Sequence, residues 1–126
     1  MKAFKGALFI LIFIGILIAV HSILMFNLSD KIAAKCDNVL TLTKSENWNK
    51  ISKETEEIKK IWDKYRIWAA LTISTDDIEQ IEISLEQSRI YAELNQKTDF
   101  LGEFTMFRML IEHIPHQEGF HIAEIL

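Results

Sequence analysis

An uninterrupted apolar run near the N-terminus constrains this chain more than any other feature. Residues 6–20, GALFILIFIGILIAV, contain no polar side chain, and after His21 and Ser22 the run resumes with ILMF at 23–26. About 20 helical residues cover the ~30 Å hydrocarbon core of a bilayer, and a helix satisfies its own backbone hydrogen bonds in lipid. We therefore predict that residues 4–26 cross a membrane as a helix, which makes the lipid bilayer the first expected partner.

A cleaved signal peptide is the rival interpretation of this segment, because MKAFK precedes the long apolar run. The run is longer than is typical of a signal peptide. The sequence AVH at 19–21 also places a bulky histidine where a signal peptide cleavage site requires a small residue. We therefore predict an uncleaved membrane anchor at residues 1–27, followed by a separate domain at residues 28–126.

Charges near the ends of the span predict its orientation. Lys2 and Lys5 lie close to the N-terminal end, which favours a cytoplasmic N-terminus and a C-terminal domain outside the cell membrane. Residues 27–126 hold all 18 acidic residues and 12 of the 14 basic ones, a net charge of −6 with histidine neutral. Because this region has no basic stripe, we expect no binding to nucleic acid.

Beyond the span, apolar residues recur at steps of three and four, the spacing of one face of a helix. The four predicted stripes are Leu28, Ile32, Cys36, Val39 or Leu40, and Thr43; Trp48, Ile51, Thr55, Ile58, Trp62 and Tyr65; Ile78, Ile81, Leu85, Ser88 and Ala92; and Phe100, Phe104, Phe107, Ile111 and Ile114. The first stripe belongs either to a continuation of the membrane helix or to a new helix capped at Ser29. The fold class is therefore predicted as all-α, an N-terminal transmembrane helix followed by a three- to four-helix antiparallel bundle.

Polar and helix-breaking residues predict where these helices begin and end. The predicted N-caps are Ser45 for the second helix, Ser74 for the third, and Thr98 or Asp99 for the fourth. Pro115 and Gly119 are expected to end the fourth helix, leaving GFHIAEIL as an apolar tail that folds back on the bundle.

Three of the four histidines, His113, His116 and His121, lie close together near the C-terminus. Three imidazoles and a carboxylate suffice for zinc, but this spacing matches no known zinc motif. We therefore expect a helix end with an exposed tail, and no metal or cofactor. Cys36 is expected to be a buried apolar filler, because a single cysteine forms no disulfide within the chain.

The aromatic residues suit two roles. Spacing of three and four predicts a helical core, whereas tryptophan and tyrosine are also enriched where a peptide or a partner helix binds. The residues that would line such a partner groove are Trp48, Trp62, Trp68, Tyr91, His113 and Phe120.

Four stretches in order complete the pattern: the apolar span, ENWNKISKETEEIKKIWDKYRIWAAL, STDDIEQIEISLEQSRIYAEL and LIEHIPHQEGFHIAEIL. With them, nearly the whole chain resembles a family of small single-pass membrane proteins from Gram-positive bacteria, described as a domain of unknown function. EHIP and DDIEQIEISL are the most specific parts, and the last three residues depart from the family's Asn-Ile-aliphatic ending. The resemblance implies a membrane-anchored helical domain with no assigned activity, catalytic residue or cofactor.

These features predict an extracytoplasmic helical domain that acts as a protein-interaction or accessory module for a membrane protein partner or a second copy of the chain. The alternative is a ligand-sensing domain that binds a small molecule or a peptide. A lipoprotein attached through Cys36 ranks third. An enzyme ranks last, because the sequence carries no nucleophile–base pair, phosphate loop or metal motif.

Overall fold

The computed structural model describes the backbone of residues 2–71 and 73–125 and the side chains of residues 2–71 and 73–114. Within these ranges the chain forms helices and no strand. The elements are α1 (Lys2–Leu42), the 3-10 turn η1 (Thr43–Ser45), α2 (Trp48–Ala70), α3 (Thr75–Glu93) and α4 (Lys97–Ile125). The all-α prediction, with an apolar N-terminal helix followed by packed helices, is confirmed.

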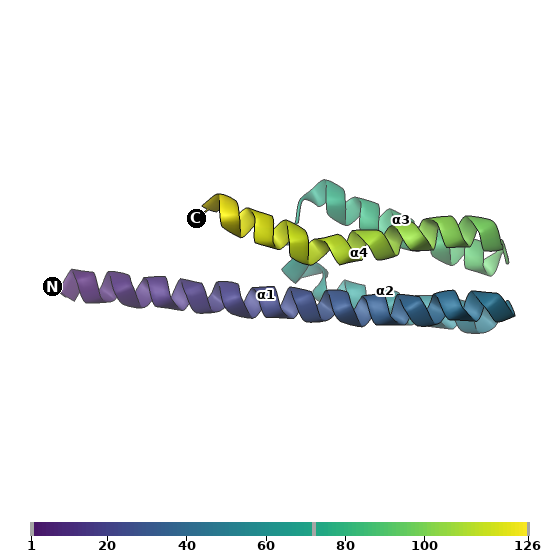
Figure 1. The fold of residues 1–126 in the computed structure, drawn as a ribbon, viewed down its shortest axis with the longest axis horizontal. Helices are drawn as coiled ribbons and strands as arrows, with labels where there is room; N and C mark the ends of the chain where they lie inside the picture. Colours follow the sequence, from purple (N-terminus) through teal and green to yellow (C-terminus); the bar gives the residue numbers. More distant parts are fainter. Residues whose placement is uncertain (1, 72, 126) are drawn as a thin grey trace.

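The first helix is continuous from Lys2 to Leu42, so the alternative of a new helix beginning at Ser29 is wrong. Its N-terminal end projects beyond the other helices, and its C-terminal half packs among them (Figure 1). The helix also crosses the predicted boundary between residues 27 and 28 without a break. One rigid element therefore joins the apolar segment to the core of the bundle.

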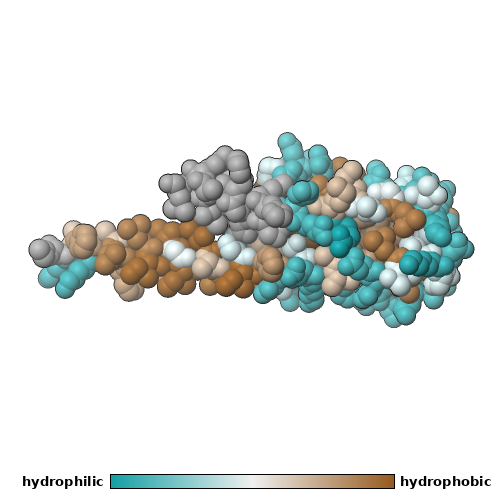
Figure 2. Space-filling model, in the orientation of Figure 1, coloured by the Kyte–Doolittle hydropathy of each residue, from teal (hydrophilic) through white to brown (hydrophobic). Residues whose placement is uncertain are grey.

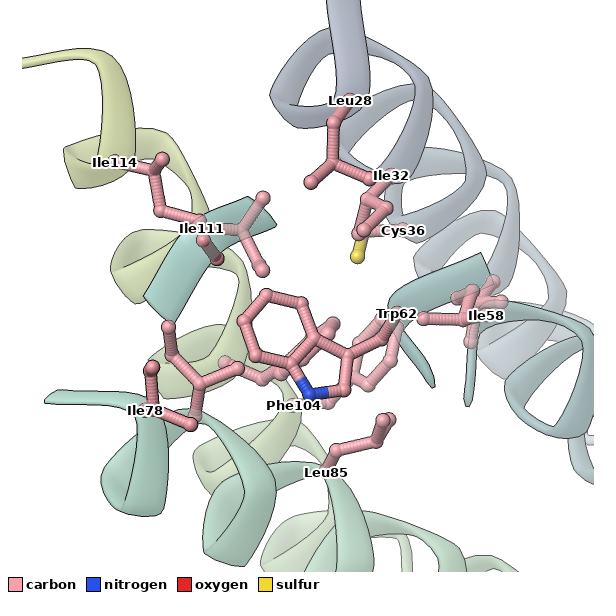
Figure 3. Close-up of a cluster of buried hydrophobic side chains, with 14 of the residues drawn as sticks. Leu28, Ile32, Cys36, Ile58, Trp62, Ile78, Leu85, Phe104, Ile111 and Ile114 are labelled. Carbon is pink, nitrogen blue, oxygen red and sulfur yellow. The ribbon is translucent and has the colours of Figure 1, made fainter. Parts of the chain in front are cut away.

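The four helices pack side by side in a ring, in which α1 contacts α2 and α4, and α3 contacts the same two helices. Short connections at Thr43–Asn47, Leu71–Ser74 and Leu94–Gln96 make successive helices antiparallel, as predicted (Figure 1). The four predicted stripes supply the buried core, where Trp62 of α2 lies between Cys36 of α1 and Leu85 of α3 (Figure 3).

Three phenylalanines of α4 form the aromatic part of the core. Phe104 stacks on Phe100 with ring centroids 5.0 Å apart and on Phe107 with centroids 6.0 Å apart. Trp48 of α2 meets the edge of Phe100 at 5.8 Å, in a T-shaped arrangement that aromatic quadrupoles favour. The spacing of three and four along α4 produces this column, because it places the rings above one another on one face.

Local hydrogen bonds define the helix ends. Ser74 is the N-cap of α3 as predicted, since its hydroxyl accepts from the backbone N–H of Asp77 at 3.2 Å. The prediction of Ser45 as the N-cap of α2 is wrong. Ser45 lies in η1 and donates back to the carbonyl of Leu42, so Asn47 caps α2 instead and accepts from the N–H of Lys50 at 3.4 Å.

The third helix ends in a left-handed turn. Asn95 has a φ of 56°, a conformation that asparagine tolerates better than most residues. Its N–H donates to the carbonyl of Ala92, and the N–H of Gln96 donates to the carbonyl of Tyr91. These two bonds are the pair that defines a Schellman motif, and they turn the chain sharply into α4.

The prediction that Pro115 and Gly119 end the fourth helix is wrong, because α4 continues to Ile125. A proline inside a helix has no N–H, so the carbonyl four residues earlier loses its helical donor. That carbonyl belongs to Ile111, and it accepts a hydrogen bond at 2.9 Å from the buried hydroxyl of Ser29 on α1. The neighbouring helix therefore satisfies the backbone group that the proline leaves without its usual partner.

Candidate functional site

The projecting part of α1 is a long, continuous apolar surface. Its side chains are exposed from Phe4 to Val20, and the bundle core begins only at Met25. Figure 2 shows apolar surface concentrated on this projection, whereas the bundle is mostly hydrophilic. Among the described residues, this is the one helix that is long and apolar enough to cross a membrane. The predicted span is confirmed to that extent.

A groove opens between α1 and α4 where the projection meets the bundle. It has a volume of about 410 Å³, and its walls combine apolar with acidic side chains. The lining residues are Phe26, Ser29, Asp30, Ala33, Met109, Glu112 and His113. Met109 and its neighbour Met106 are both about half exposed, and methionine side chains adapt readily to a partner surface.

An ion pair links α4 to α1 beside the groove. Arg108 of α4 donates to Asp37 of α1 at 2.9 Å and to Glu112 of its own helix at 2.6 Å. The hydrogen bond to Asp37 raises the pKa of the Arg108 guanidinium above its usual value. On α4, Arg108 lies three residues before Ile111, and on α1, Asp37 lies eight residues beyond Ser29, so this ion pair is a second link between the two helices.

A second groove, of about 300 Å³, lies between α2 and α3. Trp62 and Leu85 form apolar parts of its wall, and Lys59, Asp63, Glu82 and Glu86 are among its other lining residues. The indole Nε1–H of Trp62 is buried and has no hydrogen-bond partner among the residues that the structure describes. Figure 3 shows this nitrogen on the edge of the ring that faces Leu85.

The structure separates the tryptophans proposed for a partner groove. Trp48 is half-buried at the far end of the bundle, Trp62 is buried in the centre, and Trp68 is exposed at the end nearest the projection of α1. Because the buried Trp62 lies between the other two along α2, the three do not form one exposed surface.

The other proposed groove residues are also dispersed. Tyr91 is half-buried on α3, whereas His113 is exposed and lines the α1–α4 groove. The side chain of Phe120 lies outside the described residues. His113 is thus the single member of the predicted set that the structure places at the α1–α4 groove.

The predicted histidine cluster is described only in part, because the side chains of His116 and His121 lie outside the described residues. Among the side chains that the structure describes, no group of three histidine, cysteine, aspartate or glutamate residues is placed to hold a metal ion. Cys36 is buried as predicted, and burial raises the pKa of its thiol to about 12.

Ser29 is the residue whose role sequence reasoning missed. The sequence suggests only a possible helix cap at Ser29, whereas the structure places it in the α1–α4 interface and on the wall of the groove. The sequence feature that points to such a role is a small polar residue beside an apolar stripe, where a buried hydroxyl needs a hydrogen-bond partner. Its partner, the backbone carbonyl of Ile111, lies 82 residues away, and no local sequence pattern identifies it.

Searches of curated proteins and of solved structures found no match to this chain. One family model does match, and it covers residues 19–125. The match begins two residues before His21, whose ring lies 6.4 Å from the ring of Trp68 on α2, measured between centroids. It therefore includes the whole bundle and the end of the apolar run. On this evidence the chain belongs to the family described as Domain of unknown function (DUF4363).

Proposed function

We propose that this protein is a single-pass membrane protein whose helical bundle acts as an interaction module for another membrane protein. The observation that carries the proposal is the bare apolar half of α1, which the bundle leaves uncovered. Exposure of so long an apolar surface to water is energetically unfavourable. A bilayer would remove these side chains from water, and the helix would keep all of its backbone hydrogen bonds in the lipid.

The continuity of α1 supports a role at the membrane surface. The same helix enters the bilayer and contributes Leu28, Ile32, Cys36 and Val39 to the core. A flexible tether would let the bundle move away from the bilayer, whereas a continuous helix holds each of its faces at a fixed height above the lipid. The α1–α4 groove consequently stays next to the lipid surface.

The position of that groove suggests the partner. Its residues Phe26 and Met109 continue the apolar surface of the span, and Asp30 and Glu112 add negative charge just above it. A helix of another membrane protein that leaves the bilayer beside α1 would meet this groove first. An apolar helix with basic residues at its membrane-proximal end matches its chemistry.

The orientation that we propose places the N-terminus in the cytoplasm and the bundle outside. Its support is the pair Lys2 and Lys5 at the short N-terminal flank, since positive charge is retained on the cytoplasmic side. We propose no catalytic activity for the bundle.

Site-specific photo-crosslinking in native membranes tests the interaction. A photoreactive amino acid at Met109, inside the groove, is expected to capture a membrane protein, or a second copy of the chain if the bundle self-associates. The matched control is Ile90, which is similarly exposed on α3 and is expected to capture neither. If Met109 yields no adduct and the full-length protein purifies as a monomer without a partner, the interaction role is wrong.

The buried Nε1–H of Trp62, for which the described part of the chain offers no acceptor, favours ligand binding as a second candidate function. A buried donor without an acceptor costs about 1–3 kcal/mol, and a ligand oxygen that reached it through the α2–α3 groove would recover that energy. The test follows Trp62 fluorescence in a Trp48→Phe, Trp68→Phe variant while small-molecule extracts of the cell envelope are added. A saturable shift supports a ligand, and an unchanged spectrum argues against one.

A further inference from the structure

Three exposed apolar side chains gather where α2 ends and the chain turns towards α3. Ile67 is 74% exposed, Trp68 is 48% exposed and Leu71 is 68% exposed. We call these three residues the α2–α3 corner. Elsewhere on α2 the apolar residues face the core, so the corner is the place where this helix departs from its amphipathic pattern.

The contact between α1 and α2 fixes the height of the corner along the span. The ring of Trp68 lies 6.4 Å from the ring of His21, measured between centroids. His21 lies five residues before Phe26, the end of the apolar run. At the rise of an α-helix, five residues correspond to about 7.5 Å along the axis.

The direction of α2 places the rest of the corner deeper still. Figure 1 shows that α2 runs antiparallel to α1. Leu71, three residues beyond Trp68, therefore lies about one turn closer to the N-terminus of α1. If the apolar run of α1 fills the bilayer, the corner stands below the level at which that run ends. The corner cannot be at that height and remain in bulk water.

Charged neighbours limit how far the corner can enter. Arg66 precedes it and pairs with Glu82 of α3 at 2.7 Å. Asp76 and Asp77 follow it in the first turn of α3. Full burial in hydrocarbon would carry these charges with it, at a cost of several kcal/mol. The favourable depth is therefore the boundary between headgroups and acyl chains, where tryptophan is enriched and where interfacial apolar faces enter by about 5–10 Å.

We infer that the α2–α3 corner inserts into the membrane–water boundary and gives the bundle a second attachment to the lipid beside α1. This inference rests on the membrane anchoring proposed above. Two attachments on different helices fix the tilt and the rotation of the bundle relative to the bilayer. The α1–α4 groove then faces a defined direction in the plane of the membrane.

Three isoleucines allow a matched test in the full-length protein. Ile12 lies in the middle of the span, Ile67 in the corner, and Ile90 on α3, fifteen residues beyond its membrane-proximal start at Thr75. All three side chains are exposed, so Ile→Cys at each position disturbs little packing. The native Cys36 is buried, and the unsubstituted protein serves as the blank for thiol labelling.

Each variant is labelled with an environment-sensitive fluorophore and reconstituted into phosphatidylcholine vesicles. Emission is quenched either by iodide in the water or by lipids that carry a nitroxide near the top of the acyl chain. We expect the lipid nitroxide to quench the labels at Ile12→Cys and Ile67→Cys, and iodide alone to quench the label at Ile90→Cys. Circular dichroism of each labelled variant confirms that the bundle remains folded.

The three positions separate the possible failures. If Ile12→Cys responds to the lipid nitroxide while Ile67→Cys behaves like Ile90→Cys, the anchor is correct and the corner does not enter the membrane. If Ile12→Cys also behaves like Ile90→Cys, the proposed anchoring fails and the inference fails with it. If the label at Ile67→Cys is shielded from both quenchers, a protein surface covers the corner instead of lipid, which contradicts the inference.

Discussion

The hydroxyl of Ser29 on α1 donates a hydrogen bond at 2.9 Å to the backbone carbonyl of Ile111 on α4. Ile111 is the residue four positions before Pro115, so this carbonyl is the one that the proline deprives of a helical N–H. The contact supplies the donor that the proline removes, and α4 continues beyond the proline to Ile125.

Removal of this hydroxyl should destabilise the bundle. In Ser29→Ala the Ile111 carbonyl stays buried without its cross-helix donor, and we expect a loss of about 1–3 kcal/mol in the free energy of unfolding. Chemical denaturation of the full-length protein in detergent micelles, followed by circular dichroism, measures it. Ser88→Ala is the matched control, because the Ser88 hydroxyl is also buried but donates to the Ser84 carbonyl within α3. That carbonyl keeps its helical N–H, so the control should cost less.

A double-mutant cycle with Pro115→Ala isolates the role of the proline. Alanine at this position restores the N–H that can donate to Ile111. Ser29→Ala should therefore cost clearly less in the Pro115→Ala background, with a coupling energy of about 0.5–3 kcal/mol. Equal costs in both backgrounds would show that the serine does not compensate for the proline.

The aromatic column of α4 should dominate the stability of the bundle. Phe104 is fully buried and stacks on phenylalanines above and below it, so Phe104→Ala is expected to cost about 3–5 kcal/mol. Ile90→Ala, on the exposed face of α3, should change the unfolding free energy by less than about 0.5 kcal/mol. Similar effects from both substitutions, measured by the same denaturation experiment, would contradict this description of the core.

The buried thiol of Cys36 predicts a loss of stability at high pH. Burial raises the pKa of this thiol from 9.0 to about 12, so between these values the unfolded chain releases a proton that the folded protein keeps. The unfolded state then binds fewer protons, and the free energy of unfolding should fall by up to ~1.4 kcal/mol per pH unit above pH 9. Cys36→Ala removes this contribution. The difference between wild type and variant, followed from pH 8 to pH 10.5, should shrink as pH rises, and a constant difference would exclude the thiol as its cause.

The ion pair between Arg108 and Asp37 should contribute little by comparison. Both side chains are partly open to solvent, and exposed pairs of this kind are worth about 0.2–1 kcal/mol. We expect Asp37→Asn to fall in that range at low salt and to approach zero in 1 M NaCl, where charges are screened within about 3 Å. An effect larger than that of Ser29→Ala would mean that charge, not the buried hydrogen bond, holds α4 against α1.

The sequence predicts the core of this fold well, because the helical periodicity of apolar residues indicates which side chains share one face of a helix. Every residue of the third and fourth predicted stripes, from Ile78 to Ala92 and from Phe100 to Ile114, is buried. The N-cap at Ser74 also follows from sequence, since its partner Asp77 lies only three residues away. Local patterns of this kind need no knowledge of which helices are neighbours.

The errors arise where a distant segment decides the outcome. Pro115 is normally a helix terminator, and its effect here depends on Ser29 of another helix. The position of Trp68 beside His21 likewise depends on how far α2 extends along α1. The candidate surfaces, namely the α1–α4 groove and the α2–α3 corner, are therefore products of helix pairing that periodicity alone does not specify.

The central claim is that α1 crosses the membrane and holds the bundle outside. Labelling of single-cysteine variants in intact cells with a membrane-impermeant maleimide tests it most directly, and the buried Cys36 makes the unsubstituted chain the background. We predict that Ile90→Cys is labelled in intact cells, whereas Ala3→Cys is labelled only after the cells are lysed. Protection of Ile90→Cys until lysis would place the bundle in the cytoplasm and contradict the account.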